Sequence, residues 1–227
     1  MKYHKFELHA HTCEVSRCGK VPAAEMVRLY REAGYCGMMI TDHINPYTFE
    51  GLDLPTWKDK AEHFLTGYRR ALAAAKEDFS VFLGAEMHFY ESSNDYLVFG
   101  LTEDLLRYGL DNEFLNWGIL RFSDFCRAND LLLIQAHPFR KDMVIIDPDL
   151  VDGYEVVNAH PRHDSRNFIA ESWARRYHKL MTAGSDAHQA VDAARSGILM
   201  DHRPLSLDEI VLEIRSGARL IRRDDYV

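Results

Sequence analysis

Histidines recur beside acidic residues throughout this chain of 227 residues, which contains 12 histidines. His9 and His11 are two residues apart, and so are Asp186 and His188. Residues two apart on a β-strand point to the same face of a sheet, so the members of each pair can bind one ion together. Neutral imidazole and carboxylate ligands suit zinc, manganese or iron and need no thiolate. The spacing of each pair is therefore compatible with a transition-metal site.

Further metal-capable residues follow in order along the chain. They are His43 directly after Asp42, then Glu86, His137 and His160. Any one of these motifs is common by chance, and the indication comes from their occurrence after successive apolar runs. Gathering so many ionisable groups at one buried place is costly unless an ion pairs with them.

The apolar runs before these motifs predict short buried strands over 5–10, 37–41, 81–87, 96–101, 131–136, 153–157 and 180–185. Amphipathic stretches between them predict helices over 21–33, 57–77, 112–129, 164–178 and 207–216. Most of the runs are too hydrophobic for half-exposed strands, and their alternation with helices is typical of a parallel α/β sheet. About seven repeats without a Rossmann glycine motif favour a barrel, whose catalytic side chains lie at the carboxyl ends of the strands.

The composition is that of a globular protein, with 47% hydrophobic and 27% charged residues. We expect a single domain over residues 1–227. The net charge of −8 argues against a strong nucleic-acid footprint. No apolar run approaches the ~20 residues of a membrane span, and no signal peptide is apparent. Four cysteines without a CxxC pair are interpreted as reduced thiols, which predicts a cytoplasmic protein.

The ordered motifs resemble those of the PHP (polymerase and histidinol phosphatase) family. The matching segments are His-Ala-His at 9–11, Thr-Asp-His at 41–43, Gly-Ala-Glu at 84–86, Ala-His-Pro at 136–138 and Ser-Asp-Ala-His at 185–188. The resemblance covers almost the whole chain. It implies a distorted (β/α)7 barrel, two or three divalent metal ions (Zn, Mn or Fe), and hydrolysis of phosphoric esters.

The resemblance also implies roles for particular residues. It assigns His9, His11, Glu86 and Asp186 to one metal ion. Glu86 is expected to bridge to a second ion that His137 also binds.

The third metal ion is assigned His43 and His188, and here the sequence departs from the family. Six residues after the second histidine of the first motif, the family often has His or Asp, whereas this chain has Arg17. Glu14 or Ser16 could substitute, so the third ion stays an open question at this point.

A second departure concerns the fourth strand. Many family members carry a histidine at its end, where this chain has Thr102 followed by Glu103. Glu103, Asp95 or water could fill the gap.

The expected chemistry is attack of a metal-bridged hydroxide on phosphorus. Arg140 and Arg162 are the predicted phosphate contacts, since arginine binds phosphate in a bidentate manner. His160 is the predicted general acid for the leaving oxygen. Glu155 and Asn158 lie on one alternating strand, and at most one is expected to face the barrel mouth. The substrate is expected to be a small phosphomonoester, such as a histidinol-phosphate-like compound or a nucleotide, or a short oligonucleotide.

Two other classes of function stay open. Amidohydrolase barrels also use an HxH motif, but they typically lack a histidine after their final aspartate, where this chain has His188. They also often need a bridging lysine, and neither Lys58 nor Lys76 lies at a predicted strand end. The other alternative is a non-catalytic, metal-stabilised module, although such modules usually lose several ligands.

Overall fold

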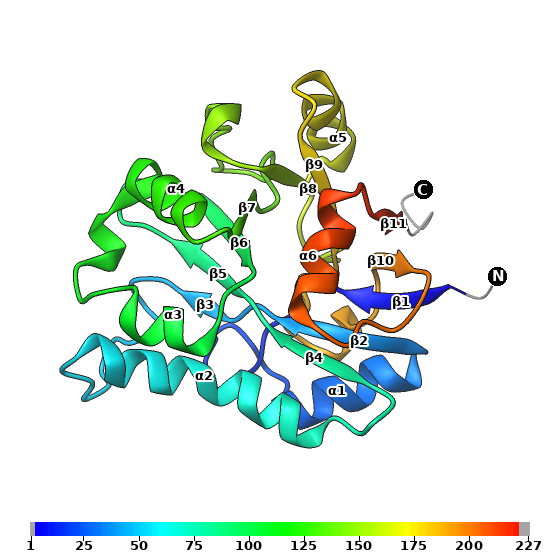
Figure 1. Cartoon of the computed structure of the whole chain (residues 1–227), viewed down its shortest axis with the longest axis horizontal. Coiled ribbons are helices and arrows are strands. Elements are labelled where there is room, and N and C mark those ends of the chain that lie inside the picture. The colour runs from blue at the N-terminus through cyan, green and yellow to red at the C-terminus, as the bar shows by residue number, and fades with distance from the viewer. Residues whose placement is uncertain (1–2, 223–227) are drawn as a thin grey trace.

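The computed structural model describes residues 3–222, and its strands form two sheets (Figure 1). In sheet order, the five-stranded sheet contains β11 (Arg219–Ile221), β10 (Gly197–Met200), β1 (His4–Glu7), β2 (Tyr35–Ile40) and β4 (Ser80–Leu83). The six-stranded sheet contains β3 (His43–Ile44), β5 (Ala85–His88), β6 (Asp95–Phe99), β7 (Leu132–Gln135), β8 (Gly153–Asn158) and β9 (Leu180–Gly184).

The two sheets are joined by backbone hydrogen bonds at two places. Where β2 leads into β3 and β4 into β5, the Glu86 N–H donates to the Asp42 carbonyl over 3.0 Å. On the other side, the His11 N–H donates to the Ala187 carbonyl over 3.1 Å, just beyond the ends of β1 and β9. The carboxyl ends of β1, β5 and β9 are therefore held close together.

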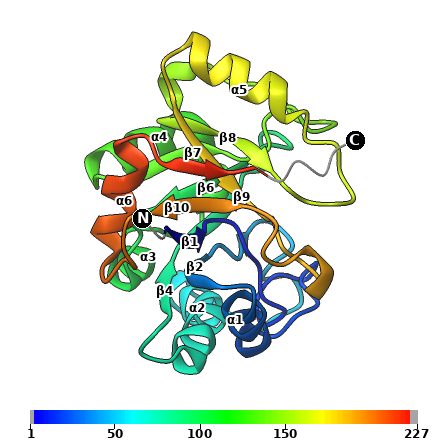
Figure 2. The same ribbon diagram turned by 90° about the vertical axis from the view of Figure 1, so that its right-hand side faces the viewer.

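The helices cover the outer faces of the sheets. α1 (Ala23–Glu32) and α2 (Trp57–Ala74) pack on each other and on β2, along the bottom of Figure 1. α3 (Glu103–Tyr108) packs on α2, and α4 (Gly118–Ala128) packs on β7. α5 (Asn167–Arg176) packs on β8 and α6 (Leu207–Arg215) on β9. Figure 2 shows α5 and the α1–α2 pair on opposite sides of the molecule.

Apolar side chains between the helices and the sheets form the core, and the polar residues of the motifs lie at the strand ends instead. Phe64 of α2 and Phe122 of α4 pack in one cluster with Tyr96 of β6 and Tyr154 of β8. None of the helices in residues 3–222 combines the length and apolarity that a membrane crossing requires.

The predicted α/β class is confirmed, while the prediction of an all-parallel sheet is wrong. β6 is antiparallel to both β5 and β7, and β10 is antiparallel to β1 and β11. The run 81–87 divides into β4 and β5, and β3, β10, β11 and α3 were not predicted.

The direction of β6 decides which of its ends reaches the other motifs. Its first residue, Asp95, pairs with His88 at the carboxyl end of β5. Thr102 and Glu103 follow its opposite end, where Thr102 caps α3 and Glu103 forms an ion pair with Arg69. Asp95 therefore lies beside the other motifs, whereas Glu103 lies at the opposite end of β6.

Candidate metal centre

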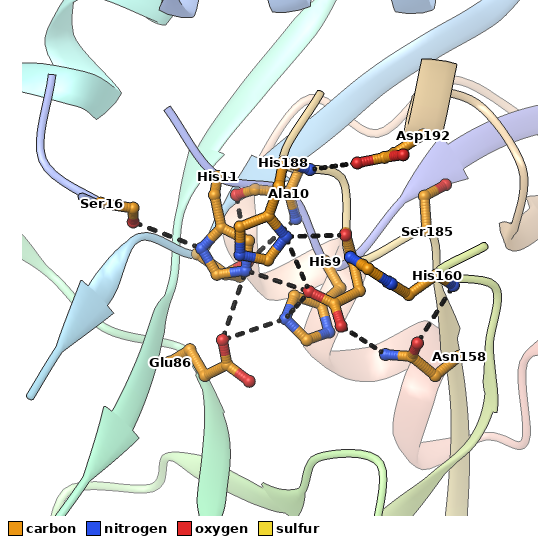
Figure 3. Close-up of polar contacts among 12 residues, drawn as sticks. His9, Ala10, His11, Ser16, Glu86, Asn158, His160, Ser185, His188 and Asp192 are labelled. Carbon is orange, nitrogen blue, oxygen red and sulfur yellow. Dashed lines mark hydrogen bonds and ion pairs between the residues drawn. The ribbon is translucent and has the colours of Figure 1, made fainter. Parts of the chain in front are cut away.

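Four buried side chains form the innermost group of the site (Figure 3). One ligand atom from each of His9, His11, Glu86 and Asp186 lies within 4.8 Å of the others. The Nε2 atoms of His9 and His11 are 3.2 and 3.3 Å from Glu86 Oε2. The same nitrogens are 3.6 and 3.5 Å from Asp186 Oδ1. The structure thus brings together the four residues that the resemblance assigns to one ion.

A second group contains Glu86, Asp95 and His137. His137 Nε2 lies 3.1 Å from Glu86 Oε1 and 3.8 Å from Asp95 Oδ2. The other oxygen of Asp95 is 2.9 Å from Nδ1 of His88, which holds the carboxylate in place. Because the two oxygens of Glu86 face different groups, this carboxylate has the geometry of a bridging ligand.

The third group consists of His11, His43 and His188. The ring of His11 lies between the other two, with centroid distances of 4.4 Å to His43 and 4.3 Å to His188. His43 Nδ1 also lies 3.1 Å from Glu86 Oε2. All seven residues that the resemblance assigns to metal ions therefore lie in three adjoining groups.

Ser16 lies beside the third group. Its hydroxyl donates to Asp42 Oδ1 over 2.7 Å, accepts the His43 N–H over 3.0 Å, and lies 3.4 Å from His11 Nδ1. Arg17 is exposed and forms an ion pair with Glu50. Glu14, the other suggested substitute, accepts from the backbone N–H that begins α1.

Buried polar atoms without a hydrogen-bond partner meet at the centre of these groups. They are Nε2 of His9, Nε2 of His11, Nδ1 of His43 and Oε2 of Glu86. Leaving such atoms unpaired in the interior costs free energy, and a cation between them removes that cost. Imidazole nitrogens and carboxylate oxygens suit Zn, Mn or Fe. The donor set therefore fits divalent metal ions.

The electrostatics of the innermost group favour charged side chains. Burial opposes ionisation of Glu86 and Asp186, but His9 and its neighbours hold the pKa of both carboxyl groups well below the usual range. Burial likewise opposes protonation of His9 and His11. The surrounding carboxylates nevertheless raise the pKa of His9 well above its usual value and that of His11 to about 9. In the metal-free protein, protons on these histidines take the place of a bound cation.

The two outer histidines behave in the opposite way. Burial lowers the pKa of His43 and of His188 to about 4, with His11 adding to the effect. Both rings are therefore neutral at pH 7, which is the form that binds a metal ion.

Glu155 and Asn158 both reach the site, so the prediction that only one of them does is wrong. Glu155 Oε1 lies 2.8 Å from His9 Nδ1, and its Oε2 accepts from the His137 N–H over 3.1 Å. The Asn158 amide donates to Glu155 Oε2 and to Asp186 Oδ2. The register of β8 shifts between Glu155 and Val157, and this bulge breaks the simple alternation of faces.

Left-handed backbone conformations direct two of the side chains into the site. The φ angles of His137 and Asp186 are 28° and 51°, and each residue follows a strand closely. Such φ values are uncommon outside glycine and cost roughly 1–3 kcal/mol, and they cluster at functional sites.

Arg140 lies against the innermost group. Its NH2 donates to Asp186 Oδ2 over 2.6 Å and to Asn158 Oδ1 over 2.8 Å. Its Nε is buried without a hydrogen-bond partner. The guanidinium is therefore fixed on one edge and retains donor capacity.

Arg162 is held by a buried carboxylate. Its two terminal nitrogens donate to Asp192 over 2.6 and 2.7 Å, and Asp192 also accepts the His188 N–H over 3.1 Å. Both ring nitrogens of His160 contact Arg162, Nδ1 at 3.3 Å from its backbone nitrogen and Nε2 at 3.0 Å from NH2, and the unprotonated one accepts a hydrogen bond. Burial, with Arg162 and Arg140 nearby, lowers the pKa of His160 to about 4. In this geometry His160 acts as a hydrogen-bond acceptor that orients Arg162. This arrangement disfavours the predicted role of His160 as the general acid.

The site opens into a cavity of about 380 Å³. Its walls include ligands from all three groups together with Arg140, His160 and Arg162. His163, Cys18 and Gln189 complete the lining, and of these three only Gln189 was not singled out from the sequence.

Comparison with known proteins gives two kinds of similarity. A model of the PHP-associated family matches residues 164–218, a segment that contains Asp186, His188 and Asp192. No curated protein matches the chain.

Several solved structures share the fold. PsfC from Pseudomonas syringae is 16% identical with a TM-score of 0.73, over 99% of this chain and 93% of PsfC. A two-domain protein from Bacteroides vulgatus, described as containing a predicted PHP-like metal-dependent phosphoesterase, is 17% identical with a TM-score of 0.63. That match covers 97% of this chain and 65% of the Bacteroides protein.

The lesion-specific endonuclease EndoQ from Pyrococcus furiosus is 14% identical with a TM-score of 0.62, over 96% of this chain and 58% of the endonuclease. At these identities the structures show a common fold. The chain therefore shares its fold with these structures, and its residues 164–218 are similar to the PHP-associated family.

Proposed function

We propose that this domain is a metal-dependent hydrolase of phosphoric esters. The observation that carries the proposal is the position of Glu86, whose two oxygens face separate groups of candidate ligands. Arg140 lies at the edge of the same cluster and lines the same cavity. The names of the Bacteroides and Pyrococcus structures support the same reaction class.

The proposed ligands are the seven residues of the resemblance with Asp95 added to the second group. Two or three Zn, Mn or Fe ions bound there would supply Lewis acidity and lower the pKa of water toward neutrality. Glu155 holds His9 with Nε2 directed at the cluster, as outer partners of metal-binding histidines do. Asn158 fixes Asp186 in a similar way.

Arg140 and Arg162 are the proposed phosphate contacts, because both guanidinium groups line the cavity. Asp192 and His160 hold Arg162 in a defined orientation, so its side chain loses little conformational entropy when it binds phosphate. We assign His160 this positioning role in place of proton donation.

The substrate class remains that of a small phosphomonoester, histidinol-phosphate-like or a nucleotide, or of a short oligonucleotide. The amidohydrolase alternative has less support, because no lysine is among the residues that line the central cavity.

The test is hydrolysis by protein loaded separately with Mn, Zn and Fe. p-Nitrophenyl phosphate and bis(p-nitrophenyl) phosphate represent phosphoric esters, and dipeptides and lactones represent amidohydrolase substrates. We expect phosphoric ester hydrolysis that chelation abolishes and that Glu86→Gln removes. Glu32→Gln, at an exposed ion pair on α1, is the matched control. Hydrolysis of dipeptides or lactones alone, or of nothing by metal-loaded protein, would contradict the proposal.

A further inference from the structure

A second cavity adjoins the central cavity on the side of α5. This neighbour has a volume of about 470 Å³ and is formed by the segment between β8 and the start of α5. Arg162 and His163 line both cavities. Phe168, on the first turn of α5, stands in the wall of the second cavity with 74% of its surface exposed.

A further pocket adjoins the central cavity near the segment after β3. This pocket of about 150 Å³ shares Cys18 and His43 with the central cavity. Tyr47 lines this pocket and also the next cavity, of about 500 Å³, which contains Tyr90 and Lys60. Tyr47 and Tyr90 are 64% and 63% exposed.

The metal centre therefore lies within a groove that has two arms, the Phe168 arm and the Tyr47 arm. Each arm begins at residues of the central cavity and contains an aromatic ring open to solvent. Exposed rings in a groove stack on flat ligand groups at about 1–3 kcal/mol for each group. Each arm also carries a cation, Arg166 in one and Lys60 in the other.

We propose that this groove binds a phosphodiester whose two ester groups are both flat rings, with phosphorus at the metal centre, one ring on Phe168 and the other on Tyr47. The inference rests on the proposed function and selects one of its substrate classes. A monoester has one organic group and would leave one arm empty, whereas a diester uses both. A short single-stranded oligonucleotide has this chemistry.

The reaction on such a substrate is hydrolysis of one ester bond. The oxygen of water forms a new bond to phosphorus, and the bond from phosphorus to one ester oxygen breaks. That oxygen leaves with one of the protons of water. The products are a phosphomonoester and an alcohol, each with one of the two rings.

The kinetic experiment compares Phe168→Ala and Tyr47→Ala on bis(p-nitrophenyl) phosphate and on p-nitrophenyl phosphate. Both variants should lower kcat/KM for the diester by about 5- to 150-fold. At most one of them should affect the monoester, which has a single ring. Tyr108→Ala is the control, since Tyr108 is 70% exposed on α3 and outside the four cavities described above. A diester rate that neither variant changes would overturn the proposal.

Binding of diphenylphosphinate, which has two rings on phosphorus but no ester bond, is measured by calorimetry and tests the groove without turnover. The dissociation constant should rise in Phe168→Ala and in Tyr47→Ala and stay unchanged in Tyr108→Ala. An affinity that both groove variants leave unchanged would overturn the proposal even if phosphoric esters are hydrolysed. Tight, ring-dependent binding without any hydrolysis would uphold the groove and contradict the proposed function.

Discussion

Nδ1 of His9 lies 2.8 Å from Oε1 of Glu155, and both side chains are fully enclosed by protein. This contact holds a proton on Nδ1 of His9, and Nε2 faces Glu86 and Asp186. Glu155 also accepts from the His137 backbone N–H. One carboxylate outside the cluster therefore orients residues of two of its groups.

Replacing Glu155 by Gln should weaken metal binding while the fold is retained. The neutral amide keeps the size of the side chain but removes the charge that supports His9, and the loss of such outer partners typically costs about 10- to 100-fold in affinity. Competition with a chelator of known affinity measures the effect. Glu32→Gln, at an exposed pair on α1, should leave the affinity unchanged. Equal affinities in the two variants would show that Glu155 has no such role.

Replacing Glu86 by Gln should remove more than one ion from each chain. Its Oε2 lies near His9, His11 and His43, and its Oε1 near His137, so one substitution affects all three groups. Elemental analysis of protein never exposed to chelator gives the count.

Asp95→Asn provides the contrast, because Asp95 belongs to the second group alone. This variant should lose at most one ion. Loss of a single ion from Glu86→Gln, with the others retained, would contradict the bridging assignment.

The sequence predicted which residues meet at the site and missed part of what supports them. Each motif directly follows or ends an apolar run, and strand ends of an α/β sheet converge, so local patterns were sufficient for His9, His11, Glu86 and Asp186. Asp95 could not be assigned in this way, because it begins its strand. It reaches the site only because β6 is antiparallel to both neighbours, which depends on pairing between distant segments.

Neither the bulge in β8 nor the partners of Arg162 could be predicted from the sequence. The alternation rule assumes an unbroken strand, and the irregularity between Glu155 and Val157 turns Asn158 toward Asp186 as well. Asp192 lies 30 residues beyond Arg162 in the chain. No periodicity connects such a pair, and only the tertiary fold brings it together.

The metal-free protein should lose stability as the pH rises from about 7 to 9.5. The folded state raises the pKa of His9 well above its usual value and that of His11 to about 9. A raised histidine pKa contributes stability below the unfolded value of about 6.5, and this contribution disappears as the pH passes the folded value. Urea unfolding of chelator-treated protein at several pH values measures the trend. Saturating Zn should remove it, because the metal ion replaces the protons. Metal-free stability that increases over this range would contradict the prediction.

Arg140→Ala and Arg162→Ala should separate phosphate binding from metal binding. A charge-assisted hydrogen bond to phosphate contributes about 1.5–3 kcal/mol, so kcat/KM should fall roughly 10- to 150-fold while most metal is retained.

Asp192→Asn tests whether Asp192 holds Arg162 in position. It keeps the guanidinium but removes its bidentate partner, and it should reduce kcat/KM less than Arg162→Ala does. Arg28→Ala, at an exposed pair on α1, should change neither quantity. Kinetics and elemental analysis of the same samples show whether each arginine contacts phosphate or instead neutralises the carboxylates of the cluster. If an arginine variant loses its metal in proportion to its activity, that arginine acts by neutralising the cluster, as the 2.6 Å contact of Arg140 with Asp186 would allow. If neither variant changes kcat/KM, both arginines are excluded as phosphate contacts.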